Sequence, residues 1–220
     1  MDTATAAKNE NRTLAAWEIA SVCVSFLLAL WVVVPLSGGA GWVRGVPLSW
    51  ALALMVLSQR ARGESWRDVG WRTDNFVAAV KLLAVPTLGA LALFLLSGWL
   101  WQSWHFERKN LLTWALWLPL WGLAQQFVLQ GYVNRRAQIL FGKDWRSVLL
   151  TACVFGVLHL PNPWLSLITF TGGLLWAWVY QKTPNLLALA LSHAGASLVL
   201  ACAWPPAMLK SLRVGINYFG

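Results

Sequence analysis

Residues 76–101 read FVAAVKLLAVPTLGALALFLLSGWLW and contain a single ionisable side chain, Lys81. A helix rises about 1.5 Å per residue, so this stretch is long enough to cross the roughly 30 Å hydrocarbon core of a membrane. Residues 15–35, 111–129 and 185–203 are similar, because each contains at most one ionisable group besides histidine. These stretches predict a protein that crosses a membrane several times.

The composition supports the same prediction. Of 220 residues, 58% are hydrophobic and only 11% are charged, and the mean hydropathy is +0.57. A soluble domain of this length carries far more charge. The net charge of +9 comes from Lys and Arg between the apolar stretches, where they act as topology signals, so we expect no nucleic-acid partner. Cys23, Cys153 and Cys202 lack Cys-x-x-Cys spacing and are expected to be small core residues.

Hydropathy predicts an all-α polytopic membrane bundle of about seven transmembrane helices, at residues 16–36, 43–58, 76–100, 111–130, 147–160, 164–181 and 186–204. We divide the chain into an N-terminal transmembrane hairpin (1–58), a core (59–204) and a short C-terminal tail (205–220). The sizeable polar connections are residues 59–75 and 131–146. With the N-terminus in the cytoplasm, eleven Lys and Arg face inward and four face outward, which favours this orientation. The composition suggests a bacterial inner membrane, with lipid around the bundle.

Polar side chains inside the apolar spans need a partner or a role, because each is costly to bury in lipid. On the fourth span, Gln126 is followed by Gln130, Asn134 and Gln138 at intervals of four, on one helix face, while Gln125 points about 100° away. The other such positions are Phe155 and His159 on the fifth span, and His193 and Ser197 on the seventh.

Each of these residues also has a structural interpretation. A buried glutamine often bonds only a neighbouring helix, and an isolated histidine is more often structural than a metal ligand. Three such groups on three helices nevertheless indicate one shared internal site. The depth of His159 is open, because the predicted limits place it nearer the outer side than His193.

The three groups, in this order, resemble the motifs of the CPBP (CAAX-processing and bacteriocin-processing, Abi) intramembrane protease family. That family typically shows Glu-Glu-x-x-x-Arg, then Phe-x-x-x-His, then His-x-x-x-Asn or a similar small polar residue. Here the corresponding residues are Gln125-Gln126 with Gln130, Phe155 with His159, and His193 with Ser197. The stretch Trp66–Arg72 is similar to a loop of the family, so the resemblance covers about residues 60–204.

The resemblance implies that a motif-one glutamate and the histidines activate a water that attacks a peptide bond, with a metal in some members. Gln125 and Gln126 cannot take a proton at useful pH. Both acids and the arginine are replaced by glutamine, which keeps the site neutral and hydrogen-bonded. Zinc held by His159 and His193 is disfavoured, because catalytic zinc usually has three protein ligands. Asp144, the one acidic residue after Glu107, is expected to pair with Lys143 or Arg146.

Two functional hypotheses remain open. In the first, the chain is an intramembrane endopeptidase for hydrophobic or lipid-modified peptides. Its catalytic residues are then His159, His193, Gln125 and Gln126, and its substrate-binding residues are Gln130, Phe155 and Ser197. Ser197 and Cys153 are weak candidates for a nucleophile. In the second, the chain is an inactive family member that binds such a peptide as a pseudoprotease, immunity or maturation protein. A transporter is disfavoured, since the spans show no evident two-fold repeat.

Overall fold

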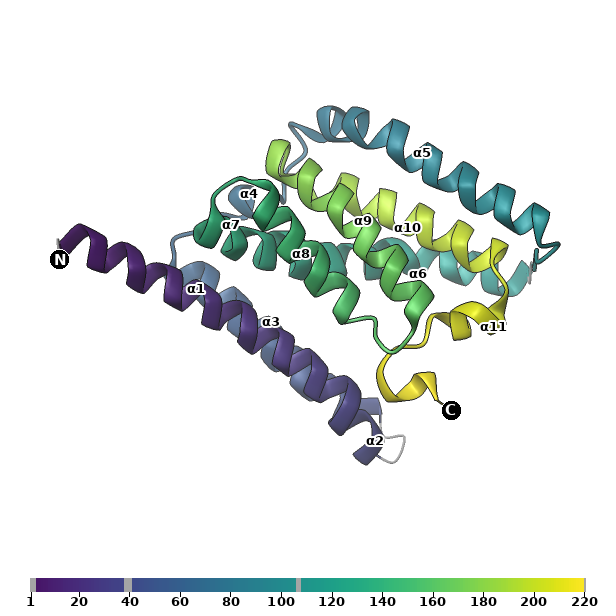
Figure 1. Ribbon diagram of the computed structural model, residues 1–220, viewed down its shortest axis with the longest axis horizontal. Coiled ribbons are helices and arrows are strands. Elements are labelled where there is room, and N and C mark those ends of the chain that lie inside the picture. Colours follow the sequence, from purple (N-terminus) through teal and green to yellow (C-terminus); the bar gives the residue numbers. More distant parts are fainter. Residues whose placement is uncertain (1–2, 38–40, 106–107, 220) are drawn as a thin grey trace.

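The computed structural model describes residues 3–37, 41–105 and 108–219, and within these ranges it contains helices and no strand. The first part of the chain forms a helical hairpin followed by one long apolar helix (Figure 1). Its elements are α1 (Thr3–Leu28), the π-helical η1 (Ala29–Val33), α2 (Val34–Leu36), α3 (Gly41–Ala61), the short α4 (Trp66–Val69) and α5 (Phe76–Leu100).

The second part of the chain holds four further helical rods and a folded terminal segment. Its elements are α6 (Arg108–Gln126), the π-helical η2 (Phe127–Asn134), α7 (Arg135–Phe141), α8 (Trp145–Val157), α9 (Pro163–Lys182), α10 (Leu186–Ala203), α11 (Pro206–Leu209), η3 (Lys210–Leu212) and η4 (Gly215–Tyr218). The prediction of an all-α bundle is therefore confirmed.

In the described ranges, three helical stretches are both long and apolar enough to cross a membrane: Lys8–Leu36, Phe76–Leu100 and Leu186–Ala203. All seven predicted spans fall on helices, but α8, the helix of the fifth predicted span, ends at Val157, before the predicted limit of residue 160. An integral membrane protein fits these helices. Seven crossings, the orientation and the three-part division of the chain stay predictions.

One predicted connection is wrong. Residues 131–146 do not form a polar loop, because the fourth rod continues through η2 and α7 to Phe141 and α8 begins at Trp145. Several of the polar side chains there bond other helices. Asn134, for example, is fully buried and donates to the Ala177 carbonyl of α9 at 3.2 Å.

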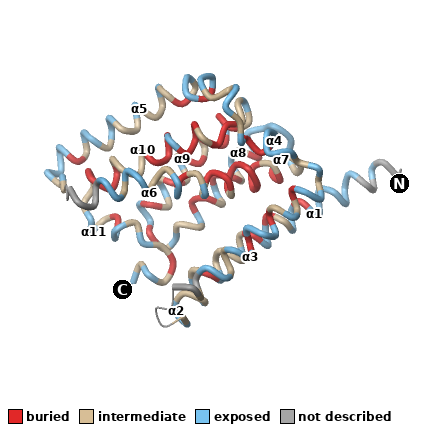
Figure 2. The backbone as a smooth tube through the Cα atoms, turned by 180° about the vertical axis from the view of Figure 1, so that it is seen from behind, coloured by how far each residue is buried: buried red, intermediate tan, exposed pale blue. Residues whose placement is uncertain are grey.

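α10 lies at the centre of the bundle and packs against both α5 and α6 (Figure 1). The approach is close, because an added methyl group on Gly98 of α5 would lie 2.8 Å from Ala203 Cβ, and one on Gly122 of α6 would lie 3.1 Å from the Ala190 carbonyl oxygen. Buried residues concentrate in α8–α10 and η2, whereas α5 is largely exposed along its outer side (Figure 2). This apolar exposed surface is what a lipid-facing helix requires.

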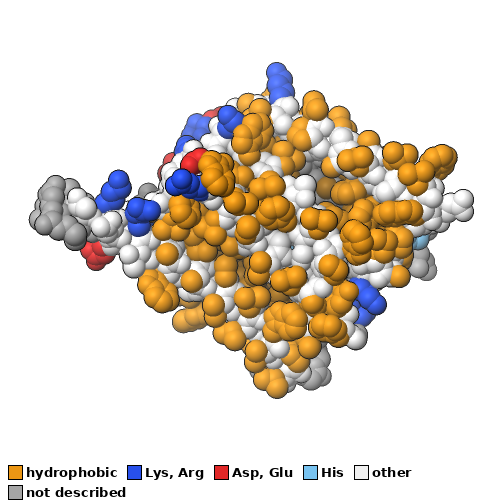
Figure 3. Space-filling view, viewed as in Figure 1, with side chains coloured by type: hydrophobic (Ala, Val, Ile, Leu, Met, Phe, Trp, Pro, Cys, Tyr) orange, Lys and Arg blue, Asp and Glu red, His pale blue; other side chains and the backbone are white. Residues whose placement is uncertain are grey.

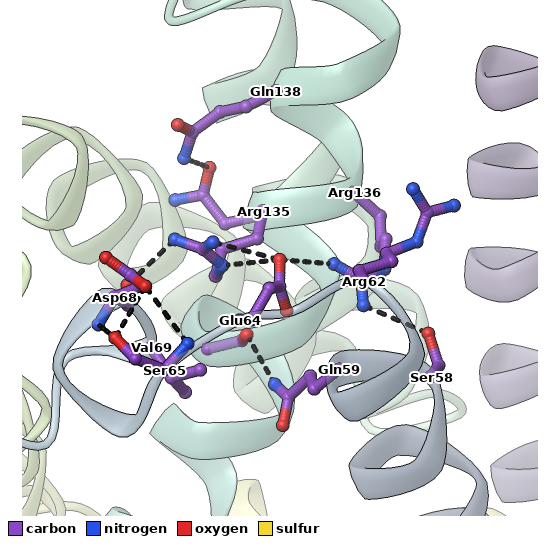
Figure 4. A network of polar contacts seen from close by, with 12 residues as sticks. Ser58, Gln59, Arg62, Glu64, Ser65, Asp68, Val69, Arg135, Arg136 and Gln138 are labelled. Carbon is purple, nitrogen blue, oxygen red and sulfur yellow. Dashed lines mark hydrogen bonds and ion pairs between the residues drawn. The ribbon is translucent and has the colours of Figure 1, made fainter.

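An ion cluster joins the hairpin to the bundle at one end, and Figure 4 shows its part around Glu64. Arg136 of α7 is fully buried and lies 2.9 Å from Glu18 of α1 and 2.8 Å from Glu64, which follows α3. Arg62 pairs with Glu18 at 2.8 Å and Arg135 with Glu64 at 2.9 Å. On the face seen in Figure 3, Lys and Arg gather toward this end and hydrophobic side chains cover most of the rest. The charged end is consistent with a membrane boundary.

Candidate active site

A cavity of about 550 Å³ lies among α5, α6, α9 and α10, and residues of the terminal segment also line it. Most of its lining is apolar. Four predicted site residues line it, namely Gln125, His159, His193 and Ser197. The structure thus brings together members of all three motif groups, as expected for a shared internal site.

His159 lies in the turn after α8 rather than on the helix. Its Nδ1 is 2.7 Å from the Phe155 carbonyl oxygen. A carbonyl oxygen only accepts, so Nδ1 carries the hydrogen and Nε2 of the neutral ring keeps its lone pair. His159 and His193 line the same cavity, although α8 ends at Val157, before His159.

His193 of α10 is buried, and packing on two sides fixes its ring. The Gln126 side-chain nitrogen lies 3.2 Å from His193 Nδ1, and the Trp176 ring stacks on the imidazole with centroids 4.5 Å apart. The Trp176 indole N–H in turn donates to the Ser192 hydroxyl at 3.1 Å, and this hydroxyl is 2.8 Å from that of Thr87. With the Gln126 amide nitrogen donating to Nδ1, the hydrogen of neutral His193 is on Nε2.

Sequence reasoning missed Trp176, Ser192 and Thr87. Ser192 precedes His193 directly, and this adjacent polar pair was a usable signal. Trp176 is one of 17 tryptophans, and Thr87 is one of two hydroxyl side chains in an apolar span, so neither stands out in the sequence.

The other three predicted site residues are not part of the cavity lining, namely Gln126, Gln130 and Phe155. The Phe155 ring contacts both imidazoles edge-on, with centroids 4.7 Å from His159 and 5.8 Å from His193. Phe155 therefore connects the two histidines by packing. Gln130 accepts from Asn134 at 2.8 Å, and Asn134 accepts from Gln138 at 3.1 Å, so these amides form a row leading away from the cavity.

Two amide atoms in this region are buried without a partner in the structure, Gln126 Oε1 and Gln130 Nε2. An unsatisfied buried polar atom costs about 1–3 kcal/mol. One of these atoms is an acceptor and the other a donor, and they belong to the motif-one positions of the fourth rod. Neither Gln126 nor Gln130 lines the cavity, so these two atoms do not mark a contact with a ligand there.

The residues present do not fit a catalytic metal centre. Across the described ranges there is no group of three His, Cys, Asp or Glu side chains placed to hold a metal ion. His159 and His193 supply two ligands where catalytic zinc usually has three. The prediction for Asp144 is wrong: its side chain accepts from the Trp145 backbone N–H at 2.6 Å and caps α8. The chemistry of the site must therefore be supplied by the side chains themselves.

Comparison with known proteins adds one finding. A search of curated proteins and a search of solved structures each gave no match. Residues 107–199 match the model of a family described as type II CAAX prenyl endopeptidase Rce1-like. The matched region contains all seven predicted site residues. The resemblance to the CPBP intramembrane proteases is therefore confirmed for this part of the chain.

Proposed function

We propose that the protein binds an apolar or lipid-modified peptide in the cavity and hydrolyses it within the membrane, with His159 as general base. The observation that carries this proposal is the common cavity of His159, His193 and Gln125. The apolar lining suits the hydrophobic part of such a peptide, and the polar side chains supply the groups that hydrolysis needs. We also propose a bacterial inner membrane and a cytoplasmic N-terminus.

The roles follow from which groups can give or take a proton. His159 Nε2 accepts a proton from a water as the water oxygen bonds to the peptide carbonyl carbon. The N–H groups of His193 Nε2 and the Gln125 amide stabilise the resulting oxyanion. The His159 imidazolium then gives its proton to the peptide nitrogen as the C–N bond breaks. Gln126 acts as a positioning residue, because it holds His193 through Nδ1.

The chain offers a matched control for these roles, because its third histidine, His105, lies outside the cavity and contacts the Ser103 carbonyl. We expect purified protein in lipid nanodiscs to cleave a prenylated or transmembrane peptide. His159→Ala and His193→Ala should each lower the rate by about a hundredfold or more. His105→Ala should cleave at the wild-type rate. Equal loss in all three variants would contradict the assigned roles.

A second function, binding without hydrolysis, is favoured by one observation. The cavity lining includes one neutral amide, hydroxyls and imidazoles and no carboxylate among the described residues, so it lacks the carboxylate base that the family usually has. An inactive family member would bind the same peptides. Wild-type protein that binds the peptide in the nanodisc assay, yet leaves it intact over days, would support this function and exclude the first.

A further inference from the structure

The segment 205–219 folds back from the end of α10 onto the turn that carries His159. The side-chain amide of Asn162, which is fully buried, donates to the carbonyl oxygens of Leu209 at 2.8 Å and Arg213 at 3.3 Å. The Gly215 backbone N–H donates to the Leu160 carbonyl oxygen at 3.0 Å. Leu160 and Asn162 therefore offer one acceptor and one donor to a peptide backbone, immediately after His159.

The segment held by this turn resembles a bound peptide. Arg213 and Val214 have extended backbones, with φ/ψ of −71°/142° and −132°/166°. Leu212 and Val214 both line the cavity, whereas Arg213 between them is exposed. Leu212 itself has a positive φ, so the extended stretch is Arg213 and Val214, and it is the cavity lining that places Leu212 and Val214 on one side. The segment thus combines main-chain hydrogen bonds with two side chains directed to the cavity, as in recognition of an extended peptide.

The chain reaches this position at a conformational cost. Three consecutive residues, Lys210, Ser211 and Leu212, have positive φ of 47°, 52° and 60°, and none is glycine. Each such residue costs about 1 kcal/mol or more. Gly215 also has a positive φ, of 59°, and a Cβ there would lie 2.9 Å from Leu30 Cβ. The contacts made beyond this bend therefore offset a strained backbone.

We infer that the turn Leu160–Asn162 is a binding site for an extended peptide segment with apolar residues at alternate positions, and that residues 212–215 occupy it as an intramolecular ligand. The inference rests on the proposed function in one respect, since it places the substrate segment beside His159. A peptide entering the cavity must displace the chain's own segment. Residues 212–215 then act as a competing ligand that limits access to the cavity.

The experiment measures access to the cavity without using hydrolysis. Ser197→Cys places a thiol in the cavity lining, Cys23→Ala, Cys153→Ala and Cys202→Ala remove the native thiols, and Arg67→Cys, at an exposed position outside the predicted spans, supplies an internal reference. The rate of maleimide labelling at position 197 is compared in this protein, in a form lacking residues 205–220 and in the full-length Leu212→Asp/Val214→Asp variant. Thermal unfolding identifies any form that fails to fold, and the full-length variant then carries the test.

Displacing the segment should raise the labelling rate at position 197 by about tenfold or more and leave that of position 67 unchanged. Adding the peptide SLRVGINYF, residues 211–219, should slow labelling again, whereas SDRDGINYF should not. An unchanged rate at position 197, or equal protection by both peptides, overturns the inference. If the protein cleaves peptide but displacing the segment leaves the labelling rate at position 197 unchanged, only this inference is refuted. If SLRVGINYF protects position 197 and SDRDGINYF does not, yet no peptide is cleaved, only the proposed hydrolysis is refuted.

Discussion

Arg136 is a residue whose surroundings in the fold cannot be predicted from its neighbours in the sequence. Its neighbours in sequence indicate a cytoplasmic loop cation, yet its side chain is fully buried between Glu18 and Glu64 and lies 4.6 Å from the Tyr132 ring centroid. Both carboxylates belong to segments far away in the chain, so no local pattern predicts the pairing. A buried cation of this kind is tolerated only because its partners are equally fixed.

Arg136→Leu should destabilise the protein strongly. The change leaves two carboxylates close together with less compensating charge, and removing one partner of a buried pair costs about 3–5 kcal/mol. The matched control is Arg67→Leu, which removes an arginine paired with Asp74 but with 65% of its side chain exposed; such pairs contribute about 0–1 kcal/mol. Thermal unfolding in detergent checks both variants. Similar unfolding temperatures would mean that the buried cluster contributes no more than an exposed pair.

The glutamines of motif one permit a second prediction at this scale. Gln126→Glu places a carboxylate beside His193 Nδ1, where it can act as a base, but it also buries an unpaired charge. Gln130→Arg adds a cation about one turn away on the same rod. We expect the double variant to remain folded and to hydrolyse peptide at least about tenfold faster than wild type, because a positioned general base contributes roughly 10²–10⁴-fold. Gln126→Glu alone should unfold at a lower temperature than the double variant.

Cleavage assays and thermal unfolding of the two variants measure both effects. A folded double variant with the wild-type rate would indicate that the cavity lacks the geometry for hydrolysis. It would then favour the binding function.

At the scale of elements, hydropathy predicts those helices whose surroundings are lipid or apolar core. The span predicted at 76–100 has the same limits as α5, and the prediction for 186–204 differs from α10 by one residue. The fourth rod extends eleven residues past its predicted end because Asn134 and the arginines of α7 find partners on other elements. Sequence also indicated a shared site. It could not show that Gln130 and Phe155 do not line the cavity, which depends on the π-helical turn of η2 and on helix packing.

The contact of α5 with α10 leads to a prediction with a control in the same helix. Gly98→Ala would place a methyl group 2.8 Å from the Cβ and carbonyl oxygen of Ala203, so the two helices must move apart. Overpacking of this kind costs about 1–3 kcal/mol. A methyl group on Gly89, also in α5, meets no atom within 4 Å, so Gly89→Ala should be neutral or stabilising by roughly 0.5–1 kcal/mol.

Unfolding temperatures of the two variants in the same detergent test this contact. If Gly98→Ala unfolds at the same temperature as Gly89→Ala, then α5 can shift away from α10 without loss of stability. The packing of the cavity wall on α5 would then be loose.

At the scale of the whole molecule, the hairpin of α1 and α3 is attached to the bundle at both ends. The ion cluster of Glu18, Arg62, Glu64, Arg135 and Arg136 holds it near α7. At its other end, η1 contacts the segment 205–219, where Gly215 lies against Leu30 and the Trp31 and Phe219 rings are 6.4 Å apart. The segment that reaches the cavity thus also contacts the hairpin. Displacement of this segment by a peptide would therefore loosen the attachment of the hairpin tip.

The ion cluster also bears on orientation, because it neutralises cations that the topology count treats as free. Arg62, Arg135 and Arg136 are paired with carboxylates. Arg67 and Arg72 likewise pair with Asp74, and the six remaining inward Lys and Arg still outnumber the four on the opposite side, so the cytoplasmic N-terminus remains the expectation. Arg67→Cys and Gln102→Cys, each in a chain with its three native cysteines replaced by alanine, place single exposed thiols on the two sides predicted. In intact cells, a membrane-impermeant maleimide should label position 102 at once and position 67 only after the membrane is permeabilised. The reverse pattern would invert the whole bundle, and labelling of both positions in intact cells would mean that α5 does not cross the membrane.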